Sequence, residues 1–145
     1  MRFMAIIKSS SEFEKEDLRP DPKLLHEMGK FNDELIKAGV VLAMDGLHPR
    51  SKGAVVKFSG ESRTVVDGPF TETKELIGGF WILQVKSLEE AIEWIKRCPN
   101  LGPGDAEVEI RQVAEMEDLA PILTEEEIQY KIAKRAELPN QTRNK

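Results

Sequence analysis

The sequence predicts a single α+β domain in which two amphipathic helices cover one face of an antiparallel sheet. Its 145 residues match the usual size of one domain with one hydrophobic core. Apolar runs of strand-like composition alternate with segments whose apolar residues recur every three or four positions. The resulting order is β-α-β, a hairpin, then β-α-β, which is typical of a ferredoxin-like sheet.

The first β-α-β segment starts at the N-terminus, where "RFMAIIK" (residues 2–8) reads as a strand followed by a polar loop. Asp21 is expected to cap a helix, with Pro22 at the first helical position, where its missing N–H costs nothing. The buried stripe of this helix recurs through Leu24, Met28, Phe31 and Leu35. Gly39 ends the helix, and "VVLAMDGL" (residues 40–47) follows as the second strand.

A hairpin of "AVVKF" (residues 54–58) and "RTVV" (residues 63–66) precedes the second β-α-β segment. "IGGFWILQV" (residues 77–85) is the strongest strand candidate. Ser87 and Glu90 form a capping box for the second helix. That helix is expected to bury Leu88, Ala91, Ile92 and Ile95. The last strand, "AEVEIRQV", alternates, with Val108 and Ile110 inward and Glu107, Glu109 and Arg111 outward.

Two strands are apolar on both faces, which two helices on one side of a sheet cannot cover. Alternation places Ile77, Trp81, Leu83 and Val85 on one face of residues 77–85, with Phe80 and Ile82 on the other. Residues 2–8 show the same pattern. The uncovered face predicts a homodimer that packs sheet to sheet.

The chain becomes charged after residue 115, so residues 1–115 are expected to form the domain and residues 116–145 an extension. Thr124 and Glu127 predict a capped helix near residues 124–137, followed by a frayed tail.

Composition excludes several classes of function. A net charge of -5 without a basic stripe argues against direct nucleic-acid binding. The single cysteine, Cys98, cannot form an internal disulfide, and helix C-terminal carbonyls are expected to raise its pKa. The sequence contains no metal-ligand spacing and no phosphate-binding or cofactor motif, so no metal or cofactor is predicted. With no apolar run of signal or membrane-spanning length, the expected location is cytoplasmic.

The candidates for acid-base chemistry lie near turns. Asp45 is expected to share a strand face with Val41 and Ala43, and an acid in an apolar row is suited to proton transfer. His48 follows that strand, although Asp-Gly and His-Pro are also ordinary turn pairs. The other histidine, His26, falls on the exposed side of the first helix.

The segment "VVDGPFTETKELIGGF" (residues 65–80) combines a turn with a strand. Asp67 can accept hydrogen bonds from the backbone ahead, and Gly68 tolerates the restriction imposed by Pro69. Phe70 can anchor the turn in the core. Gly78 and Gly79 inside the strand indicate a bulge, or a close approach of another backbone or of a ligand.

These residues resemble the YciI-related superfamily, in the branch named for its Asp-Gly-Pro-Phe motif. The resemblance runs from "RFMAIIK" through "FNDELIKAGV", "GLHP", "DGPFTETKE", "GGFW" and "EAIEWIKRCP" to "EIRQV". It implies a ferredoxin-like chain that pairs into a dimeric α+β barrel. Gly46, Asp67, Gly68, Pro69 and Phe70 match as motif positions. The helix histidine of smaller relatives falls near Gly29, so the resemblance assigns no role to His26.

Two functions are consistent with this pattern. The superfamily is largely uncharacterised, but one relative is a dehydrochlorinase of a chlorinated hydroxyquinol. The first hypothesis is therefore an enzyme that binds a small metabolite and moves a proton. Its expected catalytic residues are Asp67, His48 and Asp45, and its expected ligand-binding residues are Gly68, Pro69, Phe70, Gly78, Gly79 and Trp81. The alternative is a non-catalytic ligand-binding or regulatory dimer, which the charged extension favours.

Overall fold

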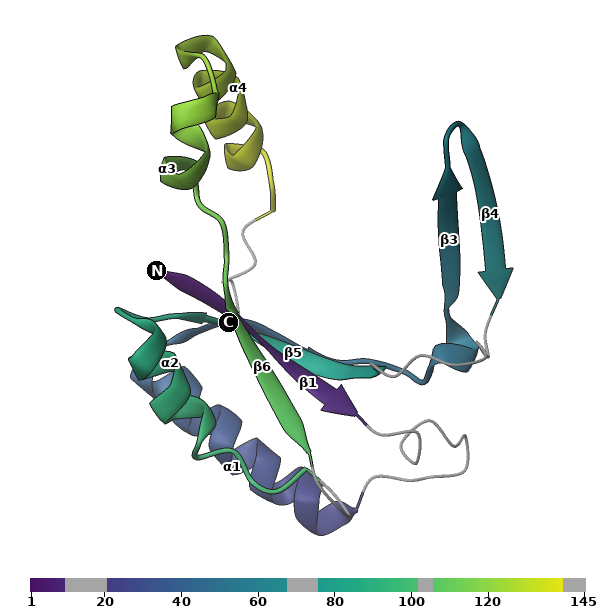
Figure 1. Ribbon diagram of the computed structural model, residues 1–145. Coiled ribbons are helices and arrows are strands. Elements are labelled where there is room, and N and C mark those ends of the chain that lie inside the picture. Colours follow the sequence, from purple (N-terminus) through teal and green to yellow (C-terminus); the bar gives the residue numbers. More distant parts are fainter. Residues whose placement is uncertain (10–20, 68–75, 102–105, 140–145) are drawn as a thin grey trace.

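The computed structural model describes residues 1–9, 21–67, 76–101 and 106–139, and it shows a four-stranded antiparallel sheet with two helices on one face (Figure 1). The strand order is β2-β5-β1-β6. The predicted order of strands and helices in residues 1–115 is confirmed. The bounds are β1 (Arg2–Ser9), α1 (Pro22–Ala38), β2 (Val41–Gly46), β5 (Leu76–Gln84), α2 (Leu88–Ile95) and β6 (Glu107–Gln112).

Two appendages project from this sheet. The predicted hairpin forms a separate two-stranded sheet of β3 (Ala54–Ser59) and β4 (Ser62–Asp67), preceded by the 3-10 helix η2 (Arg50–Lys52). After β6 the chain forms α3 (Met116–Leu119), the 3-10 helix η3 (Ala120–Ile122) and α4 (Glu125–Ala136). We call residues 116–136 the C-terminal helical unit. The sequence predicted α4 but not α3 or η3.

Local capping sets the helix ends as predicted. The Asp21 side chain accepts a hydrogen bond from the Lys23 N–H at 3.0 Å, and Pro22 is the first residue of α1. Gly39 ends that helix with φ 72°, a left-handed conformation that favours glycine. Ser87 caps α2, but Glu90 accepts from the Lys86 N–H at 2.7 Å. The predicted box at Ser87 therefore forms only in part, whereas the box of Thr124 and Glu127 is complete.

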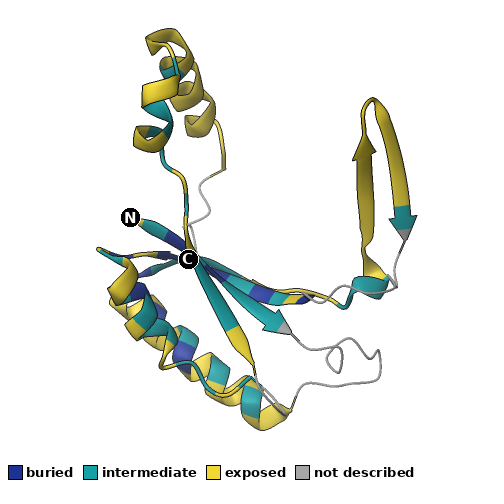
Figure 2. Ribbon diagram, in the orientation of Figure 1, coloured by how far each residue is buried: buried dark blue, intermediate teal, exposed yellow. Residues whose placement is uncertain are grey.

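The core lies between the sheet and α1 and α2, where Figure 2 shows the buried segments. Its most buried side chains include Phe3, Leu35 and Leu83. Trp81 is 2% exposed, and its ring meets that of Phe31 edge to face at 5.6 Å. Its indole N–H donates to Asn32 Oδ1 at 2.9 Å, so the one polar group of this buried side chain has a hydrogen-bond partner.

Two bulges correct the predicted strand faces. Gly78 is an extra residue opposite β1, because Ile7 pairs with Gly79 while Lys8 pairs with Ile77. The expectation that Ile77 shares a face with Trp81 is therefore wrong, and Ile77 is 48% exposed.

A second register shift separates Val41 from Ala43 in β2. Val41 pairs with Leu83 and packs against the core, whereas Ala43 and Asp45 lie on the opposite face. The predicted common face of Val41 and Asp45 is therefore wrong, because one extra residue reverses the alternation.

An ion pair fixes the start of the C-terminal helical unit to the sheet. Arg2 donates to both carboxylate oxygens of Glu115, with Nε–Oε1 at 2.6 Å and Nη2–Oε2 at 2.9 Å. The bidentate hydrogen bond holds the pKa of the Glu115 carboxyl below its usual value and raises the pKa of Arg2. The Glu115 N–H also donates to Asp118 Oδ2 at 2.8 Å, so the residue that anchors the unit also lies at the start of α3.

Candidate functional site

The face of the sheet opposite α1 and α2 carries a continuous apolar surface. Cross-strand partners share a face, so the pairs Met4–Ile82 and Ile6–Phe80 lie together on this side. All four side chains are half-buried in the single chain. We call this surface, with Ala43, Asp45 and Ile77, the open face. No helix covers it in the described parts of the chain (Figure 1).

Charged side chains flank the apolar surface along β1 and β6. Glu109 lies opposite Ile6, and its carboxylate pairs with Lys8 Nζ at 3.3 Å and with Arg111 Nε at 3.8 Å. The prediction that Glu109 and Arg111 point away from the helix-covered core is confirmed. Their position on the candidate binding surface was missed, although the alternation Met4, Ile6, Lys8 could have indicated it.

The two glycines of β5 form a close contact with β2. Gly79 pairs with Gly46, and a Cβ atom added at Gly79 would lie 2.8 Å from the backbone oxygen of Asp45. The Leu47 N–H donates to the Gly78 oxygen at 2.9 Å, which extends the ladder past the end of β2. The predicted bulge and close backbone approach are confirmed, and they explain both glycines structurally.

This contact places Asp45 on the open face, directly opposite Phe80. Asp45 is exposed in the single chain, so the burial that the sequence suggested is absent there. Its carboxylate forms no ion pair with another residue in the described ranges. His48 is also exposed, one residue beyond the last ladder hydrogen bond. Both side chains are therefore accessible to a ligand.

Among the described residues, the predicted site residues Asp67 and Trp81 lie on other elements or faces than Asp45. Asp67 is the last residue of β4, where its backbone lies opposite Ala54. Gly68, Pro69 and Phe70 lie outside the described residues. Trp81 lies on the helix-covered face, as its alternation with Phe80 requires, and we leave it out of the site.

Cys98 is not suited to nucleophilic chemistry. Burial raises the pKa of its thiol to about 11, so the predicted direction is confirmed, with desolvation as the cause in place of helix carbonyls. Within the described ranges, no group of three His, Cys, Asp or Glu side chains is arranged to hold a metal ion. The helices of those ranges include none that is long and apolar enough to cross a membrane.

Comparison with known proteins identifies relatives over most of the chain. Residues 1–117 match the family model of the YCII-related domain. A protein of Rhizobium meliloti, described only as uncharacterized, is 29% identical over 105 residues, which is 72% of this chain and 82% of the relative. The matched region includes the whole sheet, α1 and α2.

Proposed function

The chain belongs to the YCII-related domain family, and we propose that it is a homodimer that binds a small metabolite between two open faces. In this arrangement, two ferredoxin-like sheets form a dimeric α+β barrel. Asp45 accepts a proton or a hydrogen bond from the ligand. The observation that carries the proposal is this carboxylate, exposed and opposite Phe80 on an apolar sheet face.

The open face supports the dimer by its composition. Four large apolar side chains on the two central strands remain half-buried, and Ile77 adds to them at one end. Monomeric proteins rarely expose such a continuous apolar surface, and a second copy covers it with an identical one. Two sheets that pack face to face lie about 10 Å apart, which their facing side chains fill except where these are small. Ala43, which shares the open face with Asp45, is small enough to leave such a space beside it.

Chemistry at this position suits a small aromatic or halogenated compound that carries a hydroxyl or an activated C–H group. Apolar side chains hold the body of such a ligand, and a positioned carboxylate takes its proton. His48 lies close along the chain and is the second candidate for proton transfer. The Asp-Gly-Pro-Phe motif supports the proposal that the protein belongs to the branch of the family named for it.

A thermal-shift screen of phenols, halogenated aromatics and small carboxylates tests the proposal. A ligand that binds only the folded state stabilises it by about 2.7 kcal/mol when present at about 100 times its dissociation constant. We expect at least one aromatic compound to raise the melting temperature of the wild type. Asp45→Asn should remove most of that shift, whereas the matched control Asp33→Asn, on the exposed side of α1, should keep it.

Two results decide between the functions. If the compound that binds is also converted, as product analysis by NMR would show, the protein is an enzyme. Binding without conversion supports the non-catalytic alternative. An Asp45→Asn variant that binds every hit as the wild type does would contradict the proposed site.

A further inference from the structure

Within the described residues, the hairpin of β3 and β4 has no buried side chain that would hold it in place. Every residue of β3 is exposed, and Figure 2 shows the exposure along the whole strand. An isolated two-stranded hairpin is marginally stable in water. Its stability therefore requires a surface supplied from elsewhere.

One side of the hairpin presents an apolar surface with a single cation. The pairs Val56–Val65 and Phe58–Arg63 share this side. Val56 is 48% exposed, Val65 is 63% exposed and Phe58 is 70% exposed. The Arg63 guanidinium lies 4.4 Å from the centre of the Phe58 ring. We call these four residues the hairpin face.

The C-terminal helical unit is exposed as well. None of its residues is buried, and Tyr130 is 64% exposed. A pocket of about 290 Å³ opens on this unit, with Leu123 and Tyr130 as its apolar walls. Its charged residues are Glu126, Glu127 and Lys131. Two carboxylates against one ammonium favour an occupant with an apolar body and a positive group.

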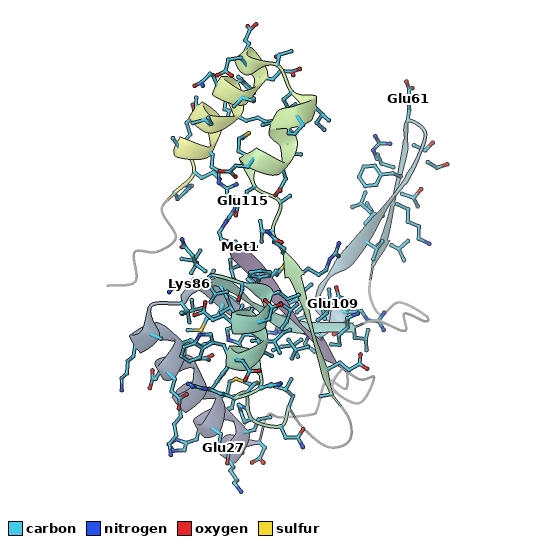
Figure 3. The ribbon with its side chains drawn as sticks, turned by 60° about the vertical axis from the view of Figure 1, so that its left-hand side comes forward. Met1, Glu27, Glu61, Lys86, Glu109 and Glu115 are labelled. Carbon is cyan, nitrogen blue, oxygen red and sulfur yellow. The ribbon has the colours of Figure 1, made fainter. Side chains whose placement is uncertain are left out.

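The two appendages lie on opposite sides of the open face and rise from the sheet on that same side, as Figures 1 and 3 both show. When two open faces pack together, a two-fold axis can bring hairpin to helical unit twice, or hairpin to hairpin. Contact between the two hairpins brings the Arg63 side chains of the two copies together. Contact between hairpin and helical unit brings Arg63 of one copy to Glu126 and Glu127 of the other.

We propose that each hairpin face docks on the helical-unit pocket of the second copy, with Phe58 and Arg63 as the anchoring side chains. This inference rests on the proposed dimer and adds to it a reciprocal contact outside the sheets. Each appendage thereby covers the apolar surface of the other. Aromatic and arginine side chains are the residues that most often dominate such interfaces.

Sedimentation equilibrium of paired variants tests the contact. Phe58→Ser should raise the dimer dissociation constant at least about tenfold, while Lys57→Ser, on the other side of the same strand, changes it less than about twofold. Arg63→Glu should weaken the dimer, and adding Glu126→Arg should restore it. These side chains are exposed, so circular dichroism should show every variant folded.

Cysteine cross-linking distinguishes the arrangements. In a Cys98→Ala background, Phe58→Cys together with Tyr130→Cys should give a covalent dimer on oxidation, and Phe58→Cys alone should not. A covalent dimer from Phe58→Cys alone indicates hairpin-to-hairpin contact and overturns the inference. So does a wild-type dimer that Phe58→Ser leaves unchanged, although the proposed function then stands. A monomeric wild type overturns both.

Discussion

Replacing Gly79 by alanine tests whether the Gly46–Gly79 pair is needed for the close approach of the β2 and β5 backbones. The new Cβ would lie 2.8 Å from the Asp45 oxygen and 3.2 Å from the Gly46 Cα. Ordinary contact begins near 3.4 Å, so β2 and β5 must separate by about 0.6 Å. Overpacking of this kind costs about 1–3 kcal/mol, and the lost freedom of the unfolded chain offsets about 0.4–1 kcal/mol. We expect a net loss of about 1–2 kcal/mol.

The matched control is Gly46→Ala in the facing strand, where the nearest atom to an added Cβ is the Gly78 oxygen at 4.0 Å. Thermal unfolding should show Gly79→Ala melting roughly 2–8 °C below the wild type, whereas Gly46→Ala should melt close to the wild type. Both variants should be compared at one protein concentration, because a dimer's melting temperature depends on it. Equal melting temperatures for the two variants would refute the close-approach argument.

Three further predictions concern the core, the extension and the thiol. Leu35→Ala, at a fully buried site, should cost about 2–5 kcal/mol in urea unfolding; a loss below about 1 kcal/mol would contradict the assigned core. Because the pKa of Glu115 is lowered in the folded state, its pair with Arg2 stabilises above the unfolded-state pKa, and this contribution is lost as pH falls through the folded value. Glu115→Gln should thus cost about 1 kcal/mol or less at pH 7, and this cost should shrink as the pH is lowered below the unfolded-state pKa of a glutamate, with Glu117→Gln as the control; a cost that stays constant as the pH falls would argue against this role. With a thiol pKa of about 11, only about a thousandth of Cys98 is ionised at pH 8, so thiol reagents should modify it slowly until the pH is raised; rapid labelling at pH 8 would be inconsistent with its burial.

Features set by neighbouring residues could be predicted from the sequence. Asp21 and Gly39 bound α1, and Thr124 starts α4, because a cap is a contact between residues a few positions apart. The hairpin strands also follow from a short local pattern. Element order therefore emerged from local chemistry alone.

The face of the sheet on which each strand residue lies could not be predicted from the alternation of apolar and polar residues alone. One extra residue at Gly78 and another at Leu42 reverse which side chains face the helices, so Ile77 and Val41 were misplaced. A glycine at position 79 indicated that another backbone approaches the strand closely, but only the pairing with Gly46 identified that backbone as β2. Periodicity is reliable only between such breaks.

The candidate site was predicted in part. Asp45 was singled out as an acid among apolar residues, and it does lie on the apolar open face. Its accessibility was not foreseen, because burial depends on which face the bulge at Leu42 turns toward the helices. Lys8 and Glu109 belong to different strands, so their ion pair on this face required the strand order. Long-range neighbours of this kind have no local signature.

The most direct test of the account is the mass of the protein in solution. Sedimentation velocity at micromolar concentration should give twice the 16.4 kDa of one chain. Ile82→Arg, which places a charge at the centre of the open face, should give the mass of one chain while the protein stays folded. A wild type that sediments as a monomer, or an Ile82→Arg variant that stays dimeric, would contradict the pairing of open faces.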